Sequence, residues 1–206
     1  MVKYLVAWFL IIATAYAEAP VPRVGTRMSD ESAVRLWTQH PEGLSRCSGF
    51  AISKTLIVTA AHCVSHGAQT SYEWEGARYQ LKLLVMGQPA TPYDIALLES
   101  EEPHPFRPLI LNQKKPKLDE EVFFLVNNSE GPFKYAGKMS ADFLPEDWAI
   151  KAACMRGDSG GAVLNKDGEV FAVEWGVNNN TAECYVSPIR TLVSWLKRFR
   201  IVVEPL

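Results

Sequence analysis

Short apolar runs, rich in β-branched and aromatic side chains, alternate along the chain with turn-forming residues. Runs of this kind are typical of β-strands, and the turn formers between them are typical of tight connections. We predict strands at residues 50–52, 56–60, 79–85, 94–98, 122–126, 161–164 and 169–173. Asp167 and Gly168 lie between the last two runs and predict a hairpin turn, because such turns need a residue with positive φ. The pattern therefore predicts an all-β fold, either a barrel or a sandwich.

The carboxyl end has a helical period instead. Its apolar residues recur at steps of three and four and follow Ser187 and Pro188: they are Ile189, Leu192, Val193, Leu196 and Phe199. We predict a C-terminal amphipathic helix that packs on the body of the protein. Residues 103–117 have the proline and lysine content of a linker, which divides the chain into halves at 24–110 and 111–206.

The amino terminus has the organisation of an export signal. Lys3 precedes an apolar run at 4–12, and the stretch then ends in Ala15-Tyr16-Ala17. This order is typical of a secretory signal peptide. An uncleaved anchor is the alternative, but the run is shorter than the roughly 20 residues of a spanning helix. We predict a signal peptide at 1–17 and a secreted protein, extracellular or periplasmic, with no membrane association after cleavage.

Charge and cysteine content narrow the function further. The 206 residues include 21 Lys and Arg and 23 Asp and Glu, with no dense basic run, so we expect no nucleic-acid partner. The four cysteines lack the spacing of zinc ligands, and we expect no metal and no cofactor. In an exported chain they form disulfides, for which three pairings exist. Pairing Cys47 with Cys63 and Cys154 with Cys184 closes two short loops, each worth about 3 kcal/mol.

A candidate nucleophile is Ser159 in the motif Gly-Asp-Ser-Gly-Gly at 157–161. Glycines let the backbone approach a substrate and let a turn aim the hydroxyl and nearby N–H groups at one point, as acyl transfer requires. The motif also fits the nucleophile elbow of α/β-hydrolases, in which the base histidine follows the serine. All histidines of this chain precede the serine: His40, His62, His66 and His104. The elbow is therefore excluded unless the base comes from elsewhere.

His62 and Asp94, which both precede the serine in the chain, have the right context for a catalytic triad. His62 ends a strand-like run, and Asp94 opens another, so the chain order is His, Asp, Ser. This is the order of the chymotrypsin-like proteases. The other three histidines lack such context, and we expect them at the surface.

From about Cys47 to the last helix, the chain resembles the trypsin and chymotrypsin family of serine proteases. The motifs that carry the resemblance lie at 47–50, 59–63, 94–98, 157–161 and 175–176. The resemblance implies a trypsin-like double barrel of two six-stranded antiparallel sheets, with the active site in the cleft between them. Each barrel contributes part of the triad. The resemblance also implies the local cysteine pairing, with one disulfide beside the histidine and one bracketing the specificity pocket.

The resemblance further implies a secreted, monomeric serine endopeptidase that acts on protein or peptide substrates. His62 is the expected general base, Asp94 the group that orients it, and Ser159 the nucleophile. The backbone N–H groups of Gly157 and Ser159 are expected to form the oxyanion hole. The expected substrate-binding residues are Ala153, Glu174, Trp175 and Gly176. The alternatives are a catalytically silent binding protein of the same fold and a secreted esterase that uses the same site.

The pocket departs from the family pattern at two places. Five steps separate Cys154 from Ser159, one more than is usual, so the base of the pocket falls at Ala152 or Ala153 and carries no aspartate. Cleavage after Lys or Arg is therefore not expected. Glu174 stands where the family commonly has a serine. It either lines the pocket or bridges to solvent, and we favour solvent because charged side chains are mostly exposed.

Activation and modification give three further expectations. Family zymogens are cut so that a new amino terminus pairs with the aspartate before the nucleophile, here Asp158. A cut after Arg23 would release a short propeptide at 18–23. A buried, unpaired Asp158 would be costly, so we expect it to have a partner. Asn127 and Asn179 fit the N-glycosylation pattern.

Overall fold

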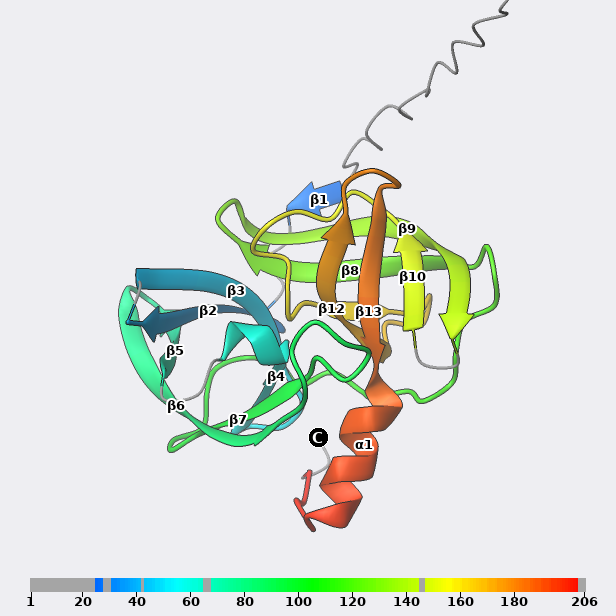
Figure 1. Cartoon of the computed structure of the whole chain (residues 1–206). Coiled ribbons are helices and arrows are strands. Elements are labelled where there is room, and N and C mark those ends of the chain that lie inside the picture. The colour runs from blue at the N-terminus through cyan, green and yellow to red at the C-terminus, as the bar shows by residue number, and fades with distance from the viewer. Residues whose placement is uncertain (1–24, 28–30, 42, 65–67, 145–146, 204–206) are drawn as a thin grey trace, which may run out of the picture.

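Two β-barrels and a C-terminal helix make up the protein (Figure 1). The computed structural model describes residues 25–27, 31–41, 43–64, 68–144 and 147–203. The predicted signal peptide, the predicted cut after Arg23 and His66 lie outside the described residues. In the described ranges, no helix has the length and apolar content to cross a membrane.

The first barrel closes six antiparallel strands in the order β2-β3-β4-β7-β6-β5. Its strands are β2 (Ala33–His40), β3 (Gly43–Ala51), β4 (Leu56–Thr59), β5 (Gln69–Trp74), β6 (Ala77–Met86) and β7 (Ala96–Ser100). A short 3-10 helix, η1 (Ala61–Cys63), follows β4. Because β4 pairs with β7, the end of β4 lies beside the start of β7, with Thr59 opposite Ala96.

The second barrel contains β8 (Glu121–Asn128), β9 (Gly131–Leu144), β10 (Asp147–Lys151), β11 (Ala162–Leu164), β12 (Val170–Asn178) and β13 (Glu183–Pro188). It closes because β8 pairs with both β9 and β11, and β1 (Gly25–Arg27) extends it along β9. Helix α1 (Ile189–Arg198) continues directly from β13. The predicted double barrel with a terminal helix is confirmed.

One apolar cluster joins the barrels to each other and to α1. It includes Phe50 and Ile95 from the first barrel, Leu125 and Val173 from the second, and Leu192 from the helix, all of them inaccessible to solvent. Each barrel has its own core in addition. Since packed cores resist deformation, the shared cluster holds the facing loops of the two barrels in fixed relation.

The predicted hairpin turn and the two predicted disulfides are confirmed. The Asp-Gly turn forms between β11 and β12, with φ of +80° at Gly168. The linker runs from β7 to β8 and contacts both barrels, through a bridge between Leu111 and Val170 of β12 and a hydrogen bond from the Leu109 N–H to the Ala51 carbonyl of β3. Both predicted disulfides are present, Cys47–Cys63 and Cys154–Cys184.

The surface position expected for His104 is wrong. Its side chain is 6% exposed and lies in an aromatic cluster with Tyr72 and Phe106. Burial lowers the pKa of His104, and backbone groups of His104, Leu56 and Phe106 partly oppose this. Tyr72 comes from β5, far from His104 in the sequence, so this part of the cover does not follow from the residues next to the histidine.

Candidate active site

The histidine and the aspartate of the predicted triad meet at one edge of the first barrel. His62 lies in η1 just after β4, and Asp94 lies in the loop just before β7, the strand that pairs with β4. His62 Nδ1 is 2.9 Å from Asp94 Oδ2. The pairing of two strands thus brings together residues that are 32 positions apart.

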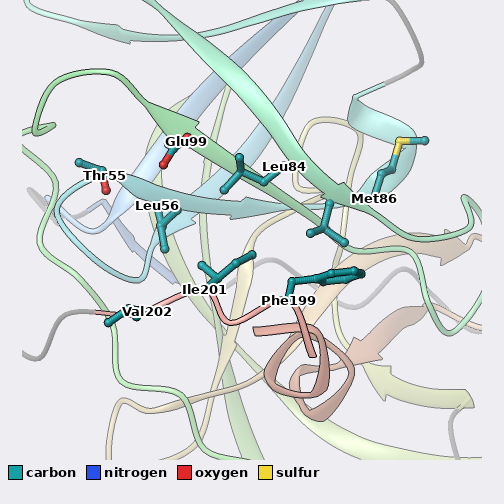
Figure 2. A pocket seen from close by; sticks show the side chains of 9 residues that line it. Thr55, Leu56, Leu84, Met86, Glu99, Phe199, Ile201 and Val202 are labelled. Carbon is teal, nitrogen blue, oxygen red and sulfur yellow. The ribbon is translucent and has the colours of Figure 1, made fainter. Parts of the chain in front are cut away.

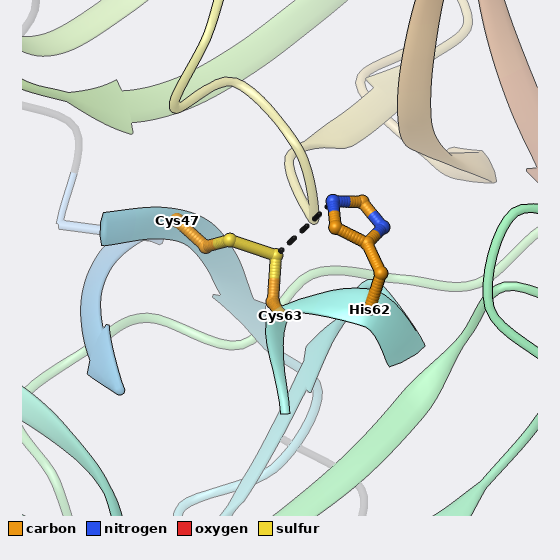
Figure 3. Close-up of side chains that lie close together, drawn as sticks. All are labelled: Cys47, His62 and Cys63. Atoms are coloured by element: carbon orange, nitrogen blue, oxygen red, sulfur yellow. Dashed lines mark hydrogen bonds between the residues drawn. A yellow bond between two sulfur atoms is a disulfide. The ribbon is translucent and has the colours of Figure 1, made fainter. Parts of the chain in front are cut away.

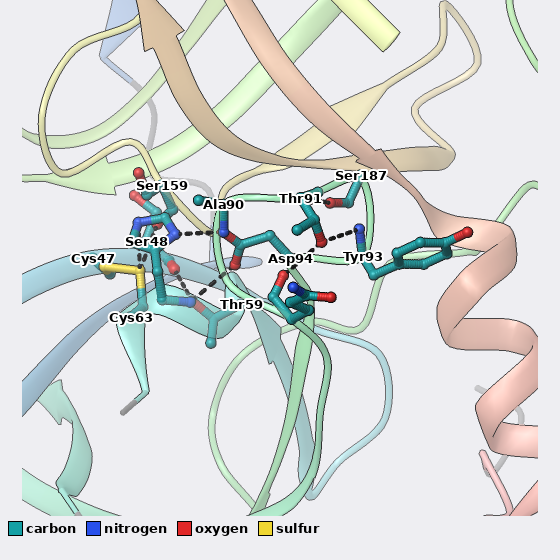
Figure 4. A network of polar contacts seen from close by, with 12 residues as sticks. Cys47, Ser48, Thr59, Cys63, Ala90, Thr91, Tyr93, Asp94, Ser159 and Ser187 are labelled. Carbon is teal, nitrogen blue, oxygen red and sulfur yellow. Dashed lines mark hydrogen bonds and ion pairs between the residues drawn. A yellow bond between two sulfur atoms is a disulfide. The ribbon is translucent and has the colours of Figure 1, made fainter. Parts of the chain in front are cut away.

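Asp94 is fully buried, and both of its carboxylate oxygens accept hydrogen bonds. The backbone N–H of His62 donates to Oδ1 at 2.9 Å, and that of Ala90 donates to Oδ2 at 2.6 Å. Figure 4 shows Asp94 within this network, with Ser159 close by. A carboxylate held in this way accepts a hydrogen bond from the Nδ1–H of His62, which keeps the proton on Nδ1 and leaves Nε2 as the acceptor nitrogen of the ring.

The outer nitrogen of the ring faces a disulfide. His62 Nε2 lies 3.8 Å from Cys63 Sγ. A dashed line marks this contact in Figure 3. Cys47, His62 and Cys63 also form a cluster of potential metal ligands. Both sulfur atoms are bonded to each other, however, and metals bind thiolates, so the cluster does not suit a metal ion.

Ser159 lies in the loop between β10 and β11, and this loop is bound to the first barrel. The backbone N–H of Ser48 donates to the Ser159 carbonyl at 2.9 Å, and the Ser48 hydroxyl donates to the Gly157 carbonyl at 2.8 Å. These bonds bring the serine to the side of the barrel that carries His62. Within the described part of the chain, no hydrogen bond joins Ser159 Oγ to His62 Nε2.

The loop also presents backbone donors. Gly157 has φ of +94°, and a Cβ there would lie 3.2 Å from Asn128 Cβ. While Ser48 engages the carbonyls of Gly157 and Ser159, the N–H groups of both residues donate to no group in the described ranges. Two such donors beside a serine hydroxyl can stabilise an oxyanion.

Gly160 lies where the nucleophile loop packs tightly against the first barrel. It has φ of +88°, and a Cβ on it would lie 2.1 Å from Thr59 Oγ1 and 2.2 Å from the Ser48 carbonyl oxygen. We expect Gly160→Ala to lower the free energy of unfolding by about 4 kcal/mol, in the range reserved for severe steric and backbone changes. Denaturant titration measures this loss.

The matched control is Gly168→Ala, at φ of +80° with no atom near the added Cβ. It should cost only about 1–2 kcal/mol, the strain of the left-handed conformation. Equal losses for both variants would show that the contact between the barrels at Gly160 is not tight.

Asp158 has the partners that its burial requires. Its carboxylate accepts hydrogen bonds from Asn128 Nδ2 at 2.6 Å, the Tyr135 hydroxyl at 3.0 Å and the Met155 N–H at 3.1 Å. Asn128 and Tyr135 come from β8 and β9, and neither was identified from the sequence. The partner expected for Asp158 is thus found within the second barrel.

Glu174 is buried, with 1% of its surface exposed, so the expected position at the solvent is wrong. Burial raises the pKa of Glu174 well above its usual value, with further contributions from the charges of Asp158 and Asp94. A hydrogen bond from the Ser159 side chain acts in the opposite direction. The side chain therefore belongs to the interior of the site.

The remaining predicted substrate-binding residues lie at the end of β12 and in the loop that faces it. Trp175 precedes Gly176 and stacks on Tyr185 of β13, with ring centroids 5.2 Å apart. Ala153 is half-buried beside the Cys154–Cys184 disulfide, which ties its loop to β13. Tyr185, which also bonds to Asn178 through its hydroxyl, was not identified from the sequence.

A separate apolar recess of about 700 Å³ lies between the first barrel and the segment after α1 (Figure 2). Leu56, Leu84, Phe199 and Ile201 line it, and none of the candidate catalytic residues does.

Asn127, the first glycosylation candidate, donates its side-chain N–H to the Ala33 carbonyl at 3.1 Å. A glycan on that nitrogen would disturb this bond.

Comparison with solved structures supports the double-barrel fold. Two proteases are among the structures that share it. The active form of the Rv3671c protease from M. tuberculosis is 20% identical, with a TM-score of 0.69 over 86% of this chain and 84% of that chain. The serine endoprotease from Yersinia pestis is 19% identical, with a TM-score of 0.68 over 82% of this chain and 62% of that chain.

Of the two sequence-based comparisons, one found a match. A search of curated proteins found no match. The family model described as a trypsin-like peptidase domain matches residues 47–173, more than half of the chain. By this match, and with a fold shared with serine proteases, the chain belongs to the trypsin-like peptidase family.

Proposed function

We propose that the protein is a secreted serine endopeptidase with Ser159 as nucleophile, His62 as general base and Asp94 as the residue that orients the base. The observation that carries the proposal is the bond of 2.9 Å between His62 Nδ1 and a fully buried Asp94. A histidine with its tautomer held in this way, beside a glycine-flanked serine, is suited to take the hydroxyl proton.

The chemistry proceeds in two halves. Ser159 Oγ attacks the substrate carbonyl carbon while its proton passes to His62 Nε2, and the oxyanion that forms faces the N–H groups of Gly157 and Ser159. His62 then gives the proton to the leaving amine nitrogen as the C–N bond breaks, which leaves an acyl-enzyme. Water then attacks the acyl carbon while its proton passes to His62. The proton returns to Ser159 Oγ as the acid product is released. Asp94 stabilises the imidazolium at both stages.

The proposed substrate is an extended peptide that pairs with β12 through backbone hydrogen bonds at Trp175 and Gly176. Ala153 offers no charge at the base of the pocket, so the proposal includes no preference for cleavage after Lys or Arg. Secretion is supported by the predicted signal peptide and by the two disulfides, which persist outside the reducing cytosol.

Labelling of the wild-type protein with a fluorophosphonate probe tests the proposal. Ser159 Oγ should form a bond to phosphorus with loss of fluoride, and mass spectrometry should find a single adduct, on the peptide that contains Ser159. Heat-denatured protein is the control and should remain unlabelled. An absence of labelling in the folded protein would favour the silent binding protein.

The esterase alternative needs a second measurement. The same preparation should hydrolyse both a peptide library and a simple ester, because the same groups serve both reactions. Ester turnover without any peptide cleavage would overturn the assignment as a peptidase, and the cleavage products would define the preferred residue at the scissile bond.

A further inference from the structure

Glu174 is a third buried carboxyl group at the site, and the proposed mechanism does not use it. It lies on β12, one residue before Trp175, and its backbone is bound on both sides to the nucleophile loop. The Gly160 N–H donates to the Glu174 carbonyl at 2.7 Å, and the Glu174 N–H donates to the Gly161 carbonyl at 3.0 Å. These bonds fix the residue beside Ser159.

The ionisable groups that face Glu174 are acidic. Asp94 faces it from the loop before β7, and Asp158 from the loop before β11, and both are fully buried. His62 is bound to Asp94, and Tyr135 of β9 is bound to Asp158. The negative charges of Asp158 and Asp94 disfavour the ionised form of Glu174.

The hydrogen bonds indicate which carboxyl group is protonated. Asp94 accepts from His62 Nδ1 and from two backbone N–H groups, and Asp158 accepts from three donors. The Glu174 carboxyl group, by contrast, interacts with one donor, the Ser159 side chain, and its Oε2 has no hydrogen-bond partner in the described part of the chain. Donors stabilise the ionised form, so the proton resides on Glu174.

The protonation state of Glu174 decides where the Ser159 hydroxyl can point. A protonated carboxyl group has an O–H that can donate to Ser159 Oγ, which leaves the serine hydrogen free for His62 Nε2. An ionised carboxylate only accepts, so it takes the serine hydrogen for itself. The two states therefore hold the nucleophile in different orientations.

We propose that Glu174 is a positioning residue that works as a neutral carboxylic acid: protonated, it turns the Ser159 hydroxyl toward His62, and ionised, it draws the hydroxyl away and stops the reaction. The inference rests on the proposed function of the same site. It makes the activity fall as the pH rises through the ionisation of Glu174.

The sign of the pH dependence follows from the direction of the shift. Because the pKa of Glu174 is raised, the neutral form persists above the pH at which an exposed glutamate ionises. Activity should fall about tenfold per pH unit once the pH exceeds that pKa, since only the neutral fraction is competent.

The test compares pH profiles of kcat/KM, and of the fluorophosphonate labelling rate, between the wild type and Glu174→Gln. Gln keeps the shape and an N–H donor for Ser159 Oγ but cannot ionise. We expect a bell-shaped profile for the wild type. The variant should lose the alkaline limb of this profile.

Two further variants complete the design. Glu174→Ser, which also cannot ionise, should likewise lose the alkaline limb, so the test does not depend on one replacement. Glu121→Gln changes an exposed acid at the start of β8 and should keep the wild-type profile. Circular dichroism at each pH shows that every variant remains folded.

The outcomes separate the two proposals. An alkaline limb that is absent in the wild type, or that persists in both Glu174 variants, overturns the role of Glu174 while the peptidase assignment stands. A wild-type protein that is neither labelled nor active at any pH overturns the proposed function, and the role of Glu174 with it.

Discussion

Ser159→Ala is expected to lower kcat/KM for peptide hydrolysis about 10⁶-fold, because the variant has no atom that can form the acyl-enzyme. The residual rate should come from substrate binding and from the N–H groups of the loop, which the variant keeps. Single-turnover hydrolysis of a peptide identified in the library measures the loss. Probe labelling should disappear in the same variant.

The matched control is Ser194→Ala, which removes an exposed hydroxyl on α1. That hydroxyl donates only to the Thr191 carbonyl within its own helix. The control should keep wild-type activity and wild-type labelling. If Ser159→Ala retained more than a hundredth of the activity, another residue would have to be the nucleophile.

Asp94→Asn should lower kcat about 10⁴-fold with little change in the fold. The side chain keeps its size at a fully buried position, but its amide can place an N–H where the wild type has the oxygen that accepts from His62 Nδ1. His62 Nδ1 would then become the acceptor, and the proton would move to Nε2. A ring protonated at Nε2 cannot take the proton of Ser159.

The control is Asp119→Asn, at an exposed turn position where φ of +61° suits asparagine as well as aspartate. Its kcat should match that of the wild type. Nitrogen chemical shifts of the His62 ring give a second readout, because they distinguish the two tautomers. A loss of less than tenfold in Asp94→Asn, with an unchanged tautomer, would contradict the orienting role of Asp94.

The three candidate groups of the triad were identified from the sequence because local context marks them. His62 closes a strand-like run, Asp94 opens another, and Ser159 lies among glycines that a sharp loop needs. The Asp-Gly hairpin turn and the terminal helix were predicted for the same reason: backbone preferences and apolar periods act over a few residues. The match of the family model to residues 47–173 agrees with these motifs.

Several strands were not predicted because their pattern is mixed. β2, β5 and β9 carry polar or charged residues among the apolar ones, and buried polar residues such as Thr38, Thr70 and Ser71 interrupt the alternation. These strands form because the barrels close around them, and closure satisfies their backbone groups with neighbours far away in the chain.

The sequence by itself determined the all-β class, the helix at the carboxyl end, the local pairing favoured for the cysteines and the residues proposed for the triad. The tertiary structure alone decided what surrounds them. It placed Asn128 and Tyr135 on Asp158, Ser48 on the nucleophile loop and Glu174 beside Ser159. The reason is physical: the exposure of a charged side chain depends on which strands and loops cover it, and those neighbours are set by the closing of two barrels rather than by adjacent residues.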